Sequence, residues 1–507
     1  METLSLLADG FATALTLQNL GWVIFGTVMG TLVGALPGLG PTAGMAVLLP
    51  FAFALNPTSA LIMLGGIYYG AMYGGTITAV LLNIPGESDA IWTALEGHKL
   101  ARRGRAGAVL IIAAVMSFLA GTMSLILLVA LAPMLADWAL SFGPAEQFGV
   151  LLIGLAMISG FASKAPVKGW IMLAFGLGIG MVGLDIVTGM PRFTFGSDRL
   201  LDGLDFLPVT VGMFGVADVL ANVEKNMRVR AENKIGLRDM MPTSEEWRRS
   251  RLPAARGTLL GFFLGVIPGS GTTMASTASY AVEQRISKKP EEFGNGAIEG
   301  VAGPESANNA ATSGAMVPIL SLGIPGSPAT AVLFGAMLMQ GLRPGPLLFQ
   351  NNPDVIWGFL ASMYVGNVIL LALNTLFIPV FTKLTVKAVP IINVFVLALC
   401  IVGVFAFRNS LFDVGVMLTF GVIGYFLNKL NYPTMPLILG IVLGDVAELT
   451  LRQSLIISRG DPMIFFSSPI AATLMTIAII VVFSPLVAML RKRRRVAAAS
   501  VQTSSVE

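Results

Sequence analysis

Two short segments place proline, glycine and hydroxyl residues in the middle of apolar sequence. Proline removes a backbone donor and glycine accepts unusual dihedral angles, so each segment is expected to break a helix. A helix that resumes after the break presents free N–H groups and a positive dipole end, which suit a carboxylate or a phosphate. We therefore predict an anionic-substrate site formed by Pro37, Gly38, Leu39, Gly40 and Thr42 in one segment and by Pro268, Gly269, Ser270, Gly271, Thr272 and Thr273 in the other.

A second pair of segments shares the motif Leu-x-Ile-Pro-Gly, at Leu82–Gly86 and Leu322–Gly326. A helix that ends at such a break leaves its last carbonyl groups unpaired, and these oxygens suit a sodium ion. The alternative is that the Pro-Gly pairs only kink helices for packing. We predict a cation-coupling site from Asn83, Pro85, Gly86 and Ser88 in the first copy and from Gly323, Pro325, Gly326 and Ser327 in the second.

A small, polar stretch between the two breaks of the second half carries one carboxyl group and two amides, Glu305, Asn308 and Asn309. We predict that the two amides bind the carboxylate substrate and that Glu305 carries a proton or binds the coupling cation, because an ionisable group at membrane depth is a functional candidate. The alternative for Glu305 is a solvated loop residue. One histidine (His98) and one cysteine (Cys400) exclude multi-histidine and cysteine metal clusters, so we predict no cofactor and no metal apart from Na⁺.

The elements that must position these residues are membrane helices. Of the 507 residues, 55% are hydrophobic and only 12% are charged, about half the charge of a typical soluble domain. Continuous apolar runs near 20 residues favour spanning helices over the alternating strands of a barrel. The predicted spans of the first half are Leu20–Leu36, Ala108–Leu135, Ala145–Phe161, Val167–Leu184 and Phe206–Leu220. The whole chain is expected to have about 11 or 12 spans, with re-entrant or discontinuous helices at the breaks.

Basic residues indicate the orientation of the chain, because lysine and arginine concentrate in cytoplasmic loops. The segment Glu224–Leu252, the loop Lys99–Arg105 and the run Arg491–Arg495 are rich in them, so all three are predicted to lie inside. The first 19 residues have none and are predicted to lie outside. The predicted divisions are an outer N-terminus (1–19), a first transmembrane repeat (20–223), an inner linker (224–252), a second repeat (253–452), a C-terminal helix (467–490) and a basic inner tail (491–507).

Matching segments recur in the same order in both halves, which indicates an internal duplication. Gly26–Gly30 is matched by Gly257–Gly261, and Pro208–Gly212 by Pro436–Gly440, in addition to the two pairs of breaks. The charge distribution starts the first copy outside and the second inside, so we predict two inverted-topology repeats. This architecture is typical of secondary transporters, whose sites form where interrupted helices of both halves meet.

These motifs, together with Gly97–Ala101, Glu299–Asn309 and Gly341–Pro346, resemble those of the large membrane subunit of the tripartite tricarboxylate transporters, the TctA family, over Leu20–Arg452. The resemblance implies a bacterial inner-membrane, multi-pass secondary transporter that takes up tri- or dicarboxylates with a cation gradient, either Na⁺ or H⁺. It also implies a small TctB-like membrane subunit and a periplasmic TctC-like solute-binding protein as partners. Membrane lipid and a small carboxylate are the other expected partners, and no nucleic acid is expected.

Two other classes of protein stay open at this point. A passive channel needs no substrate binding and no gradient. A membrane-embedded enzyme needs a nucleophile with a base, for which a single histidine in a basic loop offers little, so no catalytic residue is predicted. The chain carries no Gly-x-x-x-x-Gly-Lys-Ser/Thr motif, so transport driven by ATP would need another subunit.

Overall fold

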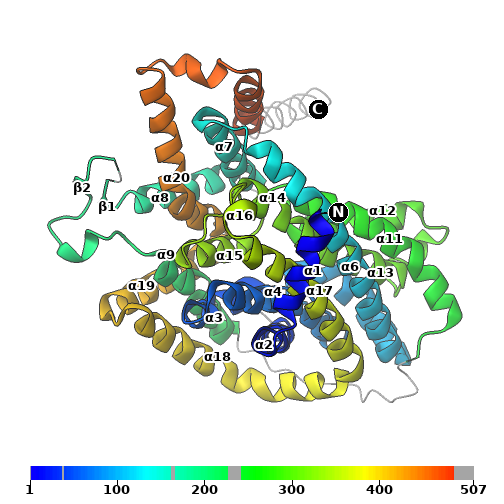
Figure 1. Ribbon diagram of the computed structural model, residues 1–507. Helices are drawn as coiled ribbons and strands as arrows, with labels where there is room; N and C mark the ends of the chain where they lie inside the picture. The colour runs from blue at the N-terminus through cyan, green and yellow to red at the C-terminus, as the bar shows by residue number, and fades with distance from the viewer. Residues whose placement is uncertain (1, 37–38, 162–165, 186, 226–240, 485–507) are drawn as a thin grey trace, which may run out of the picture. The chain divides into compact units, whose positions relative to one another are not determined.

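The computed structural model describes residues 2–36, 39–161, 166–185, 187–225 and 241–484, most of which are helical (Figure 1). The helices of the first half are α1 (Glu2–Ala14), α2 (Leu17–Gly34), α3 (Pro41–Phe53), α4 (Pro57–Leu82), α5 (Ile91–Leu100), α6 (Ala106–Ala139), α7 (Pro144–Phe161), α8 (Pro166–Gly180), α9 (Phe206–Thr210) and α10 (Ala217–Lys225). A 3-10 turn, η1 (Ser88–Ala90), precedes α5, and a short antiparallel hairpin pairs β1 (Gly183–Leu184) with β2 (Pro191–Arg192).

The second half is built in the same way from helices separated by short breaks. Its helices are α11 (Ser244–Val266), α12 (Gly271–Ile286), α13 (Glu299–Gly314), α14 (Met316–Leu322), α15 (Pro328–Met339), α16 (Leu348–Asn351), α17 (Pro353–Leu376), α18 (Ile378–Arg408), α19 (Leu411–Lys429) and α20 (Met435–Ile457). Another 3-10 turn, η6 (Pro290–Glu292), lies between α12 and α13. A further apolar helix covers Pro469–Ser484.

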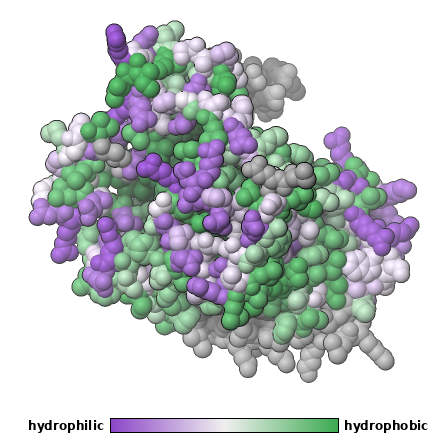
Figure 2. All heavy atoms as spheres, in the orientation of Figure 1, coloured by the Kyte–Doolittle hydropathy of each residue, from purple (hydrophilic) through white to green (hydrophobic). Residues whose placement is uncertain are grey.

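Six helices in the described part of the chain are long and apolar enough to cross a membrane, and six more apolar helices are shorter. Large hydrophobic side chains such as Phe175, Ile126 and Phe263 are exposed, and Figure 2 shows hydrophobic residues over much of the visible surface. Such a surface suits lipid, since soluble proteins keep exposed apolar patches small. The predicted class of helical membrane protein is therefore correct at this level, whereas the number of spans stays a prediction.

Helix α4 is a 26-residue apolar helix that the predicted spans did not include. Its glycines and tyrosines dilute its hydropathy, and the helix is buried along almost its whole length. The sequence predicts no span between Leu36 and Ala108, because a helix wrapped by other helices needs no strongly apolar surface. The structure thus adds α3 and α4 to the elements of the first half.

The chain forms two compact units, and the predicted repeat boundaries stay a prediction. One unit contains Met1–Leu140 and Leu204–Lys429, and the other contains Ser141–Gly203 and Leu430–Glu507. Each unit takes segments from both halves of the sequence. All described residues of the predicted substrate and cation sites belong to the first unit.

Small residues let α2 pack against α4, and α11 against α13, with their backbones in direct contact. A Cβ added to any of three glycines of α2 would collide with the main chain of α4, and one added to any of three glycines of α11 would collide with the main chain of α13. The contacts join Gly26, Gly30 and Gly34 to Met63, Ile67 and Ala71 in the first half, and Gly257, Gly261 and Gly265 to Gly303, Ala307 and Ala311 in the second. Because the numbers rise together along both helices, α2 runs parallel to α4, and α11 runs parallel to α13.

Contacts between the two halves fix the relative direction of α4 and α13. Thr76 of α4 is hydrogen-bonded to Glu305 of α13, and Tyr69 of α4 to Ser313 of α13. The residue number falls on α4 as it rises on α13, so the two helices run in opposite directions. Because α2 is parallel to α4 and α11 is parallel to α13, the α2–α4 pair is antiparallel to the α11–α13 pair.

Candidate functional site

Both predicted pairs of breaks interrupt helices in the structure. Helix α2 ends at Gly34 and α3 begins at Pro41, while α11 ends at Val266 and α12 begins at Gly271. Pro37 and Gly38, two of the predicted substrate residues, lie outside the described residues. The proline and glycine content therefore identified the ends of four helices correctly.

The second pair of breaks has the same local geometry in both halves. Helices α4 and α14 each end in a left-handed residue, Asn83 (φ 56°) and Gly323 (φ 70°). The N–H groups of Ile84 and Ile324 donate to the carbonyls of Thr78 and Pro318, each six residues back. The first copy uses asparagine at the left-handed position, a residue type that tolerates this conformation.

Within each half, the two breaks lie against each other. In the first half, a Cβ on Gly40 would collide with the Glu87 side chain, and one on Gly86 would collide with the Gly34 carbonyl. In the second half, the N–H of Gly269 donates to the carbonyl of Gly326 at 3.0 Å. The substrate segment and the cation segment of each half are therefore neighbours, although more than 40 residues separate them in sequence.

The acidic segment that follows the first Leu-x-Ile-Pro-Gly motif meets the start of a helix from the other half. Turn η1 packs against α12, and the Asp89 side chain lies beside Thr272 in the first turn of that helix. Asp89 is 4% exposed, and its Oδ2 atom has no hydrogen-bond partner within the described part of the chain. Because Glu87 lies against Gly40, which caps α3, the segment 87–90 stands next to the N-termini of both α3 and α12.

Further contacts join the two halves around this segment. The Tyr68 hydroxyl of α4 lies 3.3 Å from the Ser327 hydroxyl, which caps the N-terminus of α15. The Trp92 indole donates to the Thr277 hydroxyl of α12 at 3.0 Å. Asn308 is 2% exposed, and among the described residues its Oδ1 atom has no partner. A buried amide oxygen without a partner is available to a ligand or to water.

Glu305 is a buried residue of helix α13, not a solvated loop residue. It is 2% exposed, and its two carboxyl oxygens accept hydrogen bonds from the Thr76 hydroxyl of α4, at 2.8 Å, and from the Thr93 hydroxyl of α5. Both hydroxyls belong to the first half, so this carboxyl group ties the two halves together. Among the predicted residues, Glu305 therefore has the surroundings expected of an intramembrane ionisable group.

Several predicted residues have structural partners or lie at the edge of the site. Asn309 donates to the Ser117 hydroxyl at 2.8 Å and to the Glu305 carbonyl at 3.0 Å, which occupies its amide. The Ser270 hydroxyl donates to the Leu264 and Ile267 carbonyls at the end of α11. Asn83, Ser88 and Thr273 are exposed. These residues belong to the breaks, but their side chains are not all directed to one ligand.

A further buried carboxyl group, Glu96 of α5, was not predicted from the sequence. Its oxygens accept hydrogen bonds from the Tyr280 hydroxyl (2.6 Å) and from the N–H groups of Gly294, Gly296 (2.6 Å) and Ala297 (2.9 Å). Tyr280 belongs to α12 and the other three donors to the loop 294–297, about 200 residues away in sequence, so no local motif could reveal the pairing. Glu96 thus holds the loop before α13 on the first half.

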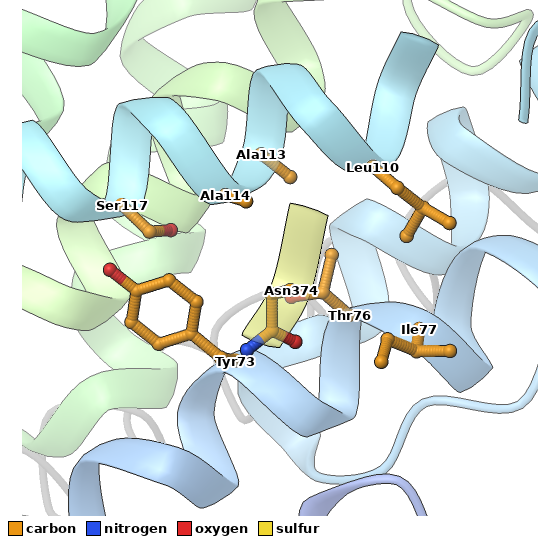
Figure 3. Close-up of a pocket in the computed structure, with 8 residues that line it drawn as sticks. All are labelled: Tyr73, Thr76, Ile77, Leu110, Ala113, Ala114, Ser117 and Asn374. Carbon is orange, nitrogen blue, oxygen red and sulfur yellow. The ribbon is translucent and has the colours of Figure 1, made fainter. Parts of the chain in front are cut away.

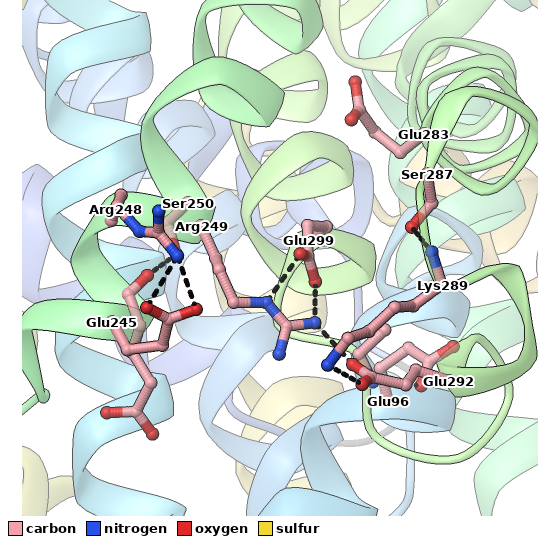
Figure 4. Close-up of polar contacts among 12 residues, drawn as sticks. Glu96, Glu245, Arg248, Arg249, Ser250, Glu283, Ser287, Lys289, Glu292 and Glu299 are labelled. Carbon is pink, nitrogen blue, oxygen red and sulfur yellow. Dashed lines mark hydrogen bonds and ion pairs between the residues drawn. The ribbon is translucent and has the colours of Figure 1, made fainter.

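An ion cluster lies beside this loop, at the start of α11 (Figure 4). Arg249 pairs with Glu299 at 2.7 Å and with Glu292 at 2.5 Å, and Lys289 also contacts Glu292. Hydrogen bonds from Arg249 and Lys289 lower the pKa of the Glu292 carboxyl, and the hydrogen bonds to Glu299 and Glu292 raise the pKa of Arg249. The cluster fixes the linker end of α11 to the loop that Glu96 binds.

A small cavity lies next to Glu305, between α4, α6 and α17 (Figure 3). It has room for about one water molecule. Its polar lining consists of Tyr73, Thr76, Ser117 and Asn374, and the rest is apolar. In the described part of the chain, no group of three or more histidine, cysteine, aspartate and glutamate residues is placed to hold a metal ion.

The apolar helices of the chain are broken around buried carboxyl, amide and hydroxyl groups. These features define a multi-pass membrane protein with a polar site in its interior. Residues 20–439 match the Tripartite tricarboxylate transporter TctA family, and the chain belongs to this family. It is therefore a component of a tricarboxylate transporter.

Two curated relatives come from Agrobacterium vitis. The chain is 44% identical over 497 residues, 97% of this chain and 98% of the relative, to an uncharacterized 52.8 kDa protein in the TAR-I ttuC′ 3′ region. It is 42% identical over 234 residues, 46% of this chain and 97% of the relative, to an uncharacterized protein in the TAR-II ttuC′ 3′ region. No solved structure matches the chain at a significant level.

Proposed function

We propose that the chain is the large permease subunit of a binding-protein-dependent secondary transporter, which takes up tri- or dicarboxylates with a cation gradient by alternating access. The observation that carries this proposal is the segment 87–90, which stands next to the N-termini of α3 and α12. One of these helices comes from each half of the chain. Helix N-termini attract carboxylates, so two separate carboxylate groups of a di- or tricarboxylate can each bind at one of these N-termini.

Inverted repeats are part of the proposal, and three observations support them. The α2–α4 and α11–α13 pairs use matching glycines, and α4 and α13 run in opposite directions. The breaks after α4 and α14 have the same hydrogen bonds. In addition, Gly212 packs on Met417 of α19, and the matching Gly440 packs on Gly176 of α8, so each copy contacts the other in an equivalent way.

Electrostatics supplies a reason for cation coupling. Glu87 and Asp89 lie at the helix N-termini where the substrate is proposed to bind, and Glu305 is buried nearby on α13. Carboxylates repel one another strongly in a low-dielectric interior. A substrate with two or three negative charges therefore enters only when protons or Na⁺ ions neutralise these groups. Uptake of the anion is then obligatorily linked to uptake of the cation.

The partners and location follow from the family. We propose a small TctB-like membrane subunit and a periplasmic TctC-like binding protein, with the chain in the bacterial inner membrane. We also keep the predicted orientation, with the N-terminus in the periplasm and the linker and C-terminal tail in the cytoplasm. The binding protein would deliver scarce carboxylate to the outer loops, and the permease would release it inside.

The proposal is tested by replacing Asp89 with asparagine, which keeps the shape of the side chain but mimics its neutralised state. In proteoliposomes with the partner subunits, Asp89→Asn should still exchange labelled citrate across the membrane. It should lose accumulation driven by a cation gradient, because the step that needs the cation is gone. Asp137→Asn, at an exposed carboxyl on α6, is the matched control and should behave as the wild type. Full gradient-driven accumulation by Asp89→Asn would show that the carboxyl is not part of the coupling.

A further inference from the structure

We infer that the cavity between α4, α6 and α17 is a binding site for a sodium ion, an inference that rests on the proposed cation-coupled function. The cavity is separate from the helix breaks at which a sodium ion is predicted from the sequence. Its four polar lining residues, Tyr73, Thr76, Ser117 and Asn374, are each at most 6% exposed. They come from three helices and surround a space of about one water molecule.

An unpaired oxygen atom points to a ligand in this space. The Asn374 amide donates to the Leu370 carbonyl at 3.0 Å, whereas its Oδ1 atom has no hydrogen-bond partner among the described residues. Figure 3 shows this side chain at the cavity beside Thr76. A buried carbonyl oxygen without a partner is costly, and a cation in the cavity offsets that cost.

The other polar groups can also present oxygen lone pairs to a cation. The Thr76 hydroxyl uses its proton on the Glu305 carboxyl, and the Tyr73 hydroxyl uses its proton on Asn367. The Ser117 hydroxyl accepts from Asn309 and lies 3.4 Å from the Glu305 carbonyl. Hydroxyl and carbonyl oxygens are the ligands of hard cations. The cavity lining contains no sulfur and no imidazole, which disfavours a transition metal.

The charge at the cavity suits a monovalent ion. The Thr76 hydroxyl lines the cavity and donates to the Oε2 atom of Glu305 at 2.8 Å, so it connects the cavity to this carboxyl group. No ionisable group other than the Tyr73 phenol lines the cavity. One buried carboxylate balances one positive charge. The ion would contact α4 and α6 of the first half and α17 of the second, so its binding depends on how the two halves are placed. This gives the bound cation a direct influence on alternating access.

Binding of ²²Na⁺ to the purified full-length chain in lipid nanodiscs tests the site without substrate or partners. The wild type should show saturable binding that unlabelled Na⁺ displaces and K⁺ does not. Asn374→Leu and Ser117→Ala should bind at least tenfold more weakly. Thr375→Val is the matched control, because Thr375 neighbours Asn374 on α17, bonds only to its own helix and does not line the cavity. It should bind Na⁺ as the wild type does.

A second measurement separates loss of the site from loss of the fold. Na⁺ should raise the melting temperature of the wild type and of Thr375→Val by mass action, and it should leave that of Asn374→Leu unchanged. Absence of saturable Na⁺ binding by the wild type, or equal binding by Asn374→Leu and Thr375→Val, would overturn the inference. Citrate uptake driven by protons alone would then leave the proposed transport function standing. Sodium binding without any carboxylate transport would instead contradict the proposed function and leave the site intact.

Discussion

The glycine seams between α2 and α4 and between α11 and α13 allow the repeat to be tested by matched substitutions. A Cβ at Gly30 would lie 2.8 Å from the Cα of Ile67, and a Cβ at Gly261 would lie 2.5 Å from the Cα of Ala307. Carbon atoms in ordinary contact are about 3.5–4.0 Å apart, so either alanine forces its helix pair apart by about 1 Å. Overpacking of this kind costs about 1–3 kcal/mol. We expect Gly30→Ala and Gly261→Ala to destabilise the protein by similar amounts.

The control is Gly21→Ala, in the same helix as Gly30. Nothing lies within 4 Å of a Cβ added at Gly21, so this change should be neutral or slightly stabilising, since alanine favours helices over glycine by about 1 kcal/mol. The melting temperature of the purified chain in detergent is measured from the loss of its monodisperse size-exclusion peak on heating. If Gly30→Ala or Gly261→Ala melts at the same temperature as Gly21→Ala, the close backbone packing inferred here is wrong.

Three further predictions concern the loop contacts and the orientation. Replacing Glu96 with alanine removes the acceptor for four donors, of which two are buried, so it should lower the melting temperature and speed proteolysis at 294–297, while Glu96→Gln should be milder. Hydrogen bonds from Arg249 and Lys289 lower the pKa of Glu292 in the folded protein. Its contribution to stability should therefore be present above the pKa of glutamate in the unfolded chain, about 4.3, and should be lost as the pH falls through the pKa of Glu292 in the folded protein. Melting curves of wild type and Glu292→Gln should therefore differ near pH 7 and converge in acid. An Arg230→Cys variant that lacks Cys400 should resist an impermeant thiol reagent added outside intact cells, and labelling there would contradict the predicted orientation.

Local chemistry explains why the breaks could be predicted from the sequence. Proline and glycine act on their own backbone, so Pro268–Gly271 and the two Leu-x-Ile-Pro-Gly motifs identified helix ends without knowledge of the fold. The matching order of the motifs in the two halves also indicated which break of the first half corresponds to which break of the second. The same reasoning located Glu305, because a carboxyl group in apolar sequence is conspicuous whatever its partners are.

Tertiary contacts explain what the sequence could not provide. Asn308 and Asn309 are neighbours of the same type, yet only Asn309 reaches Ser117, and this difference depends on the direction in which α13 faces α6. Glu96 lies beside His98 and Lys99 in a basic stretch, and nothing local distinguishes it from a solvated residue. Its four hydrogen bonds appear only when the fold brings Tyr280 of α12 and the loop 294–297 to α5.

The most direct test of the account is reconstituted transport. The chain, the proposed small membrane subunit and the proposed periplasmic binding protein, supplied with citrate as the test tricarboxylate, are combined in proteoliposomes, and an inward Na⁺ or proton gradient is imposed. We expect labelled citrate to accumulate, chemically unchanged, above its external concentration, and accumulation should require both the gradient and the binding protein. Rapid equilibration of citrate without either would indicate a passive channel, and conversion of citrate to another compound would indicate an enzyme. Either result would contradict the proposal of a binding-protein-dependent secondary transporter.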